Sequence, residues 1–203
     1  MKGLIMAGGK ARRMNYRNKA MINLYDKPMI WYVINALKHS KIDSIVCAVN
    51  NKDTASYASR EGIYVLQTPG KGYSLDLRYA LETLKNDKVL VMPVDLPLVN
   101  SKLINYIIEK SYGKKGCICI MVKGMLIDKF GINNNFSKFV NGEELFYTGI
   151  SIIDTSRLDN LEEEYIVIDD YRLAINVNTE HELRLVEDIF KDYLIASQSL
   201  HKS

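Results

Sequence analysis

The sequence predicts a three-layer α/β sandwich, in which a mainly parallel, mixed sheet is covered by helices on both faces. Short apolar runs alternate with segments of helical periodicity through the first half of the chain. This order is typical of parallel strands joined by right-handed helical crossovers. Glycines follow the first apolar run and asparagines follow the second, as expected where strands end. In such Rossmann-like folds, ligands bind at the carboxyl ends of the strands.

Four buried strands and four helices are predicted in the first half. Each strand is a short apolar run, and the helices carry apolar side chains at three- and four-residue spacing. Pro28 is placed at the first helical position, and Ser74 and Ser101 are expected to cap their helices. The strands are expected at residues 2–7, 44–49, 63–67 and 88–92, and the helices at about 28–40, 54–61, 74–85 and from 101 onward.

The second half of the chain is less regular. Its strands are predicted near residues 117–123, 145–153 and 174–177. A polar loop with Asn133, Asn134 and Asn135 joins the first two, and we interpret it as a candidate lid over an acceptor. The last helix opens with a capping box formed by Thr179 and Glu182. Its buried face is expected to contain Leu183, Val186 and Ile189.

Length and composition favour one compact domain. The chain has 203 residues, of which 47% are apolar and 25% charged, values that exclude a disordered chain, a collagen and a disulfide scaffold. We expect a single domain over residues 1–195 and a polar tail over residues 196–203. The net charge of +3 is small and the basic residues are dispersed, so no nucleic-acid or membrane partner is indicated. No stretch approaches a transmembrane span.

The cysteines and the first residues indicate a cytoplasmic protein. The apolar stretch at the N-terminus is too short for a signal peptide, and the three cysteines are an odd number, which favours reduced thiols. Cys117 and Cys119 lie in an apolar run with no histidine nearby in sequence, so we do not interpret them as metal ligands. The sequence is compatible with a homodimer but does not specify one.

The strongest chemical pattern is a loop directly after the first strand, which combines two glycines with three closely spaced cations. The glycines allow the backbone to approach an anion, and the cations offset the charges of a triphosphate. A solvated basic turn is the alternative. The loop is neither a Walker A loop, which needs Gly-Lys-Ser or Gly-Lys-Thr, nor a dinucleotide fingerprint. The predicted nucleotide-binding residues here are Ala7, Gly8, Gly9, Lys10, Ala11, Arg12 and Arg13.

A second element is the apolar strand that ends near Asp95. It delivers one carboxylate to the carboxyl end of the sheet, and a hard oxygen ligand is what Mg²⁺ needs beside phosphates. Magnesium there would neutralise charge that develops on a phosphoryl group. An isolated aspartate after a strand is often only a turn or helix cap. Together with the glycine loop, however, Asp95 is predicted as the metal ligand and Mg²⁺ as the cofactor.

Gly70, Lys71 and Gly72 stand at a helix entrance, where free N–H groups and the helix dipole favour an anion or a base. A flexible turn is an equal alternative from these residues alone. We predict that this turn also binds the nucleotide.

Three later residues are predicted on the acceptor side. Gly149 lies in a strand, where a residue without a side chain suggests that a bulky ligand approaches the backbone. A bulge glycine is the alternative. Asn176 and Asn178 could bind the acceptor phosphate or complete the metal shell, although asparagine before a helix is ordinarily a cap.

The glycine loop resembles the signature of the nucleoside-triphosphate transferases, and its Ala-Gly-Gly-Lys-Ala-Arg-Arg-Met form is similar to that of molybdenum cofactor guanylyltransferases. The resemblance implies the nucleotide-diphospho-sugar transferase type of fold and catalytic roles for Arg13, Lys19 and Asp95. It places Lys19 on phosphate. Ala11 and Ala20 depart from the usual glycine and proline of that family.

The segment Thr-Pro-Gly-Lys-Gly-Tyr-Ser-Leu-Asp-Leu, which begins at Thr68, resembles archaeal adenosylcobinamide-phosphate guanylyltransferases. Further matches at Asp95-Leu96, Gly149-Ile150 and the Asn-Val-Asn-Thr run extend the resemblance over nearly the whole chain. It implies transfer of GMP from GTP to adenosylcobinamide phosphate, giving adenosylcobinamide-GDP and pyrophosphate during assembly of the cobalamin nucleotide loop.

Two alternatives remain open. A molybdenum cofactor guanylyltransferase is favoured by the Ala11 form of the loop and by Asn-Val-Asn-Thr. A non-catalytic GTP-binding regulator is the other, and the presence of Asp95 together with Lys19 counts against it, because binding alone needs no metal carboxylate placed for transfer.

Overall fold

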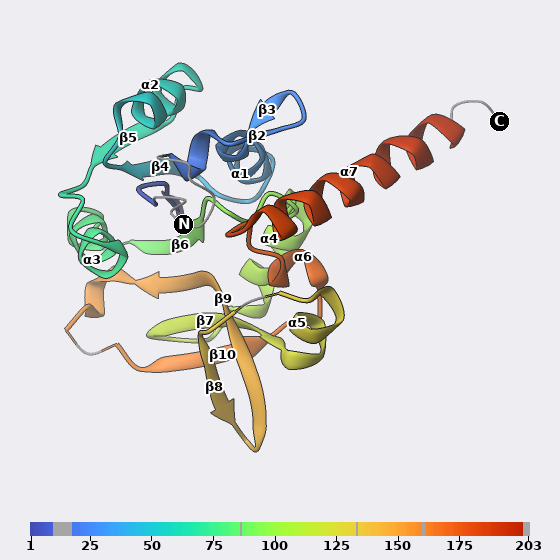
Figure 1. The fold of residues 1–203 in the computed structure, drawn as a ribbon. Coiled ribbons are helices and arrows are strands. Elements are labelled where there is room, and N and C mark those ends of the chain that lie inside the picture. The colour runs from blue at the N-terminus through green and yellow to red at the C-terminus, as the bar shows by residue number, and fades with distance from the viewer. Residues whose placement is uncertain (10–17, 86, 133, 160, 201–203) are drawn as a thin grey trace.

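The computed structural model describes residues 1–9, 18–85, 87–132, 134–159 and 161–200, with side chains described as far as residue 192. An eight-stranded sheet in the order β10-β7-β9-β6-β1-β4-β5 forms its centre, and β8 pairs with β9 beside it (Figure 1). Helices cover both faces of the sheet. The predicted α/β sandwich is therefore confirmed.

The first half of the chain forms the parallel part of the sheet, because β1 pairs in parallel with β4 and β6, and β4 pairs in parallel with β5. The predicted order of elements is confirmed, with bounds that shift by a few residues. The strands are β1 (Lys2–Met6), β4 (Ser44–Val49), β5 (Tyr64–Gln67) and β6 (Lys88–Pro93), and the helices are α1 (Met29–Lys38), α2 (Lys52–Arg60), α3 (Tyr73–Thr83) and α4 (Ser101–Lys110). A short hairpin of β2 (Asn23–Leu24) and β3 (Lys27–Pro28) precedes α1, and the 3-10 helix η2 (Lys19–Met21) precedes this hairpin.

The helix caps differ from the predicted ones. Pro28 has extended backbone and is the residue before α1 rather than its first helical residue. Gly72, with φ +114°, precedes α3, so Ser74 lies inside the first turn. Asn100 caps α4 in place of Ser101, because its side-chain oxygen accepts a backbone N–H of the first turn at 3.0 Å.

The second half adds the antiparallel part. The long strand β9 pairs antiparallel with both β6 and β7, and β10 is parallel to β7. These elements are β7 (Cys117–Lys123), α5 (Gly124–Phe130), β8 (Ser137–Val140), β9 (Glu143–Asp154), the 3-10 helix η3 (Thr155–Arg157), β10 (Glu163–Val167), α6 (Tyr171–Ala174) and α7 (Glu180–Leu200). Only β7 and β9 were predicted as strands here.

The predicted strand at residues 174–177 is wrong. Ala174 ends α6, and the residues after it form an irregular connection into α7. Ile175 and Val177 are apolar because both are fully buried in the core. The Val177 N–H donates to the carbonyl of Asp95 at 2.9 Å. Burial of a connecting segment thus produced the same pattern as a strand.

The capping box of α7 is confirmed. Thr179 Oγ1 accepts the N–H of Glu182 at 3.4 Å, and the Glu182 carboxylate accepts the N–H of Thr179 at 2.8 Å. Val186 is fully buried, and Leu183 and Ile189 pack against the same core. The helix continues to Leu200, so the tail predicted from residue 196 is helical that far. No helix among the described residues is long and apolar enough to cross a membrane.

The two faces of the sheet bury different clusters. In β1, Ile5 points into a large core that includes residues of α1, α2, α4, α5, α6 and α7, whereas Leu4 and Met6 point into a smaller core under α3. A third cluster, Cys119, Met121 and Leu145, is separate from both, and the apolar side chains packed against it all come from strands. We call this part of the sheet, which no apolar helix side chain covers among the described residues, the open sheet face.

Candidate functional site

A cavity of about 440 Å³ lies at the carboxyl ends of β1, β4, β5 and β6. This is the position expected for a ligand in an open α/β sheet. It brings together most of the described residues that the sequence predicted for the nucleotide and the metal. These are Gly8, Gly9, Lys19, Gly70, Lys71, Gly72 and Asp95. Ala7 is buried and gives its N–H to the carbonyl of Ala48 at 2.9 Å, so it supports the loop from below and does not line the cavity.

The cations predicted for the triphosphate fall outside the described residues. Lys10, Arg12 and Arg13 lie there together with Ala11, and Asn133 of the predicted lid also falls outside the described residues. Its neighbour Asn134 is tied to β9, since its side chain donates to the carbonyl of Tyr147 at 3.1 Å.

Asn50 is a cavity residue that the sequence analysis missed. A Cβ at Gly8 would lie 3.0 Å from the side-chain nitrogen of Asn50, and one at Gly70 would lie 3.3 Å from it. The asparagine side chain therefore occupies the space that both glycines leave. The available clue was its position directly after β4, at the ligand-binding edge of the sheet.

The turn at Gly70 is held by a buried carboxylate. Asp76 is 4% exposed, and its Oδ1 accepts the N–H of Gly70 at 2.9 Å and that of Lys71 at 3.2 Å. The prediction that the N–H groups of this turn point outward is wrong for these two, because a buried carboxylate must be hydrogen-bonded. The turn lines the cavity with its other atoms, and the positive φ of Gly70 and Gly72 gives it this shape.

We expect the variant Asp76→Ala to lower the free energy of unfolding by about 1–3 kcal/mol, because the turn loses two hydrogen bonds to a charged acceptor. The affinity for GTP should fall as well, since the turn lines the cavity. Denaturant unfolding and a GTP titration measure the two effects. Asp76→Asn keeps an acceptor oxygen and should lose less of both. Wild-type stability in Asp76→Ala would contradict this account of the turn.

The centre of the site is an ion pair with two asparagines. Lys19 Nζ donates to Asp95 Oδ2 at 2.5 Å and to Asn178 Oδ1 at 2.6 Å. Asn176 donates from the other side, to Asp95 Oδ1 at 3.2 Å and to the carbonyl of Thr148 at 3.3 Å. Both members of the ion pair are largely buried, with side chains 10% and 16% exposed. The predicted catalytic lysine and aspartate are therefore in direct contact.

This geometry bears on the two open interpretations of the asparagines. Asn176 contacts the predicted metal ligand Asp95, and Asn178 contacts Lys19. The backbone of Asn178 is fixed in turn, because its N–H donates to the Glu182 carboxylate at 2.7 Å. These contacts favour the predicted role of Asn176 and Asn178 beside the metal over their predicted role in binding the acceptor phosphate.

The oxygens around Lys19 fit a hard cation. One carboxylate oxygen of Asp95 and the amide oxygen of Asn178 converge on a positive charge, and such oxygens are the ligands that Mg²⁺ prefers. Within the described part of the chain, no three His, Cys, Asp or Glu side chains cluster as a metal site. A magnesium ion at Asp95 would therefore need amide, phosphate or water oxygens to complete its shell.

Gly149 lies at a bulge of β9, where the register with β7 shifts between Cys119 and Met121. It is exposed, has φ +83°, and a Cβ there would lie 3.1 Å from Pro93, which lines the cavity. Gly149 is therefore a bulge glycine and also lies next to the cavity, so both predicted explanations for this glycine apply. Any side chain at this φ is strained, so lost turnover in a Gly149→Val variant would not by itself identify a ligand contact.

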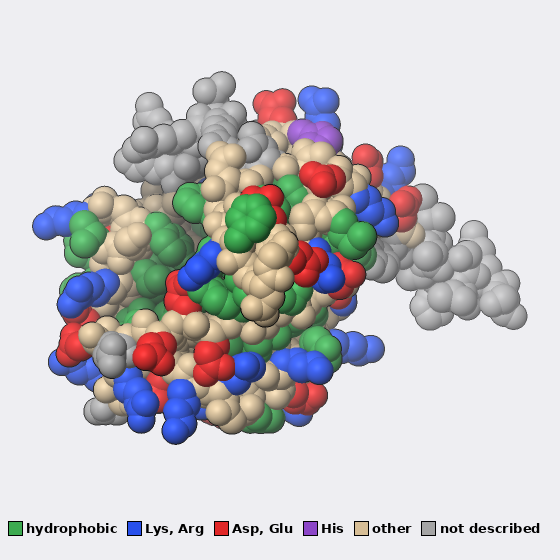
Figure 2. Space-filling model, turned by 90° about the horizontal axis from the view of Figure 1, so that it is seen from below, with side chains coloured by type: hydrophobic (Ala, Val, Ile, Leu, Met, Phe, Trp, Pro, Cys, Tyr) green, Lys and Arg blue, Asp and Glu red, His purple; other side chains and the backbone are tan. Residues whose placement is uncertain are grey.

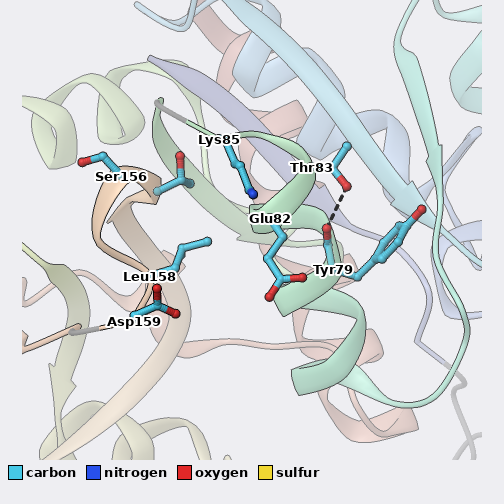
Figure 3. Close-up of a pocket in the computed structure, with 8 residues that line it drawn as sticks. Tyr79, Glu82, Thr83, Lys85, Ser156, Leu158 and Asp159 are labelled. Atoms are coloured by element: carbon cyan, nitrogen blue, oxygen red, sulfur yellow. Dashed lines mark hydrogen bonds between the residues drawn. The ribbon is translucent and has the colours of Figure 1, made fainter.

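A second cavity, of about 480 Å³, lies near the opposite end of the sheet (Figure 3). It opens between the end of α3 and η3, and its walls include Glu82, Lys85 and Asp159. The dashed contact in the figure joins the Thr83 hydroxyl to the carbonyl of Tyr79 at 2.8 Å, within α3. None of the residues predicted for chemistry lies there, so the cavity at Asp95 is the candidate catalytic site.

Comparisons with known proteins identify the family of the chain. Residues 3–130 match the model of the MobA-like NTP transferase domain. The chain is 32% identical over 202 residues to the adenosylcobinamide-phosphate guanylyltransferase of Methanocaldococcus jannaschii, with 94% of this chain and 98% of that protein covered. It is 35% identical over 105 residues to a molybdenum cofactor guanylyltransferase of Clostridium perfringens, named as probable, with 51% and 50% covered.

The fold also recurs among solved structures. A CMP:2-keto-3-deoxy-manno-octonic acid synthetase complexed with CTP superposes with a TM-score of 0.73 at 11% identity, covering 95% of this chain and 100% of that one. At this identity the likeness concerns the fold alone.

Proposed function

The chain belongs to the MobA-like NTP transferase family and is a nucleotidyltransferase, and from this premise we propose that it transfers GMP from GTP to adenosylcobinamide phosphate. The products are adenosylcobinamide-GDP and pyrophosphate. The observation that carries the proposal is the similarity to an adenosylcobinamide-phosphate guanylyltransferase along almost the full length of both chains. The similarity to the molybdenum cofactor enzyme of Clostridium perfringens covers about half.

The reaction needs no side-chain base. A phosphate oxygen of the acceptor forms a bond to the α-phosphorus of GTP, and the bond from that phosphorus to the bridging oxygen of the leaving pyrophosphate breaks. Because the acceptor phosphate is already an anion, catalysis reduces to positioning and charge stabilisation. The cavity contains groups for both tasks, with two glycines for close approach and Lys19 for charge.

The residues around Asp95 would hold a magnesium ion, with Asn178 beside it. When bound, Mg²⁺ supplies positive charge to the α-phosphoryl group and the leaving oxygens. In the structure Lys19 neutralises Asp95. We propose that Lys19 moves to the phosphates when nucleotide enters, which leaves the oxygens of Asp95 and Asn178 for the metal. Lys10, Arg12 and Arg13 remain our predicted partners of the β and γ phosphates.

The test is pyrophosphate release by the purified protein with Mg²⁺, GTP and adenosylcobinamide phosphate. We expect turnover with this pair, little with ATP, CTP or UTP, and none with molybdopterin as acceptor. Turnover with molybdopterin alone would instead assign the chain to the molybdenum cofactor branch, which the similarity of about half of the chain to such an enzyme supports. Tight GTP binding without transfer to either acceptor would favour a regulator.

A further inference from the structure

The open sheet face carries exposed aromatic side chains. Phe136 is 75% exposed, and the N–H of Tyr147 donates to its carbonyl at 3.0 Å, so the two residues lie opposite each other. Figure 2 views the molecule from below the view of Figure 1 and shows hydrophobic side chains among acidic and basic ones. A contiguous exposed apolar patch is one of the marks of a ligand-binding surface.

The register of the hairpin decides which face Phe136 occupies. Ser137 pairs with Phe146, which packs against the large core, so the adjacent pair of Phe136 and Tyr147 points to the opposite, open face. Tyr147 packs against the cluster of that face. Phe139 pairs with Glu144, shares the face of Ser137, and is 73% exposed. The same hairpin therefore presents two equally exposed phenylalanines on opposite sides.

Strand β9 leads from Tyr147, opposite Phe136, to the wall of the cavity at Asp95. Along β9, the residue that follows Tyr147 on the same face is Gly149, which is exposed and packs against Pro93 of the cavity wall. Tyr73 lines the same cavity and is about half exposed.

We propose that Phe136, Tyr147 and Gly149 form a platform for the acceptor, a large ring-bearing phosphomonoester whose phosphate reaches Asp95. The inference rests on the proposed function and deepens it. Gly149 keeps the floor of the platform flat, because a side chain there would stand between the ring system and the cavity. The aromatic side chains offer apolar contact area to a broad ring.

Phe139, on the same β8–β9 hairpin, provides a control for substitutions of Phe136. We expect Phe136→Ser to raise the KM for adenosylcobinamide phosphate about tenfold, a loss of about 1.4 kcal/mol of binding. The Kd for GTP and the thermal unfolding temperature should stay at wild-type values, because the side chain is exposed. Phe139→Ser removes an equally exposed ring from the opposite face and should change none of the three. Phe136→Trp should retain a KM near that of the wild type.

Calorimetric titration of adenosylcobinamide phosphate into protein saturated with a non-hydrolysable GTP analogue gives the same comparison without turnover. Equal affinities in Phe136→Ser and Phe139→Ser, with normal wild-type transfer, would overturn the platform and leave the proposed function intact. A wild-type protein that binds GTP and transfers nothing to this acceptor would overturn both.

Discussion

Replacing Asp95 with asparagine is expected to reduce Mg²⁺-dependent transfer of GMP by roughly a hundredfold or more, with GTP binding within about threefold of wild type. Asp95 contributes the one carboxylate at the centre of the site among the described residues, and Asn176 and Lys19 both hold it in place. Asparagine keeps the size of the side chain but removes the charge that a metal needs. Single-turnover transfer and a GTP titration measure the two effects.

The opposite end of β6 offers a matched control for Asp95→Asn. Asp87 also pairs with a lysine there, with 2.6 Å between Lys2 Nζ and Asp87 Oδ2, and both side chains are about one third exposed. Asp87→Asn should transfer GMP at the wild-type rate. Because Asp95→Asn leaves a largely buried lysine without its partner, thermal unfolding must also be recorded. Near-normal turnover in a folded Asp95→Asn variant would remove this carboxylate from the mechanism.

Replacing Lys19 with methionine should have two opposed effects. The affinity of the nucleotide-free protein for Mn²⁺, a spectroscopic substitute for Mg²⁺, should rise about tenfold, because no ammonium competes for the oxygens of Asp95 and Asn178. Transfer of GMP should fall roughly a hundredfold, because a charge aimed at the phosphates is lost. Paramagnetic resonance of free Mn²⁺ gives the first number and single-turnover kinetics the second.

Lys2→Met is the control for this second variant, since it breaks the surface pair with Asp87 and should alter neither number. An unchanged Mn²⁺ affinity in Lys19→Met would show that the ammonium does not stand in the metal position. The two largest predicted effects thus come from the two residues of one ion pair, Lys19 and Asp95. Only the Lys19→Met variant should bind the metal more tightly.

The parallel half of the fold could be predicted because each of its strands is, or directly follows, a short apolar run that ends at polar residues or glycines. The other half could not be predicted in the same way. Residues 163–167 form β10 near the edge of the sheet with two glutamates in them, so they lack a continuous apolar run. Residues 174–177 are apolar at three of their four positions and form no strand. The spacing of apolar residues indicates which residues are buried. Burial alone does not distinguish a strand from a buried connecting segment.

The candidate site was predictable where residue type carried the chemistry. Lys19 and Asp95 were found from charge, from spacing and from resemblance, and the structure places them in contact. Asn50 and the role of Asp76 were missed, because both depend on how a turn with positive φ folds back on its neighbours. The contact between Lys19 and Asn178 joins distant parts of the chain and could come only from the tertiary structure.

The capping box of α7 has a consequence for the order in which the site assembles during synthesis. Glu182 is 1% exposed and accepts the N–H groups of both Thr179 and Asn178, and Asn178 in turn holds Lys19. A nascent chain can therefore form the glycine loop and β6 long before Lys19 acquires its second partner. Lys19 therefore acquires all the contacts seen in the structure only after the first turn of α7 has left the ribosome and docked.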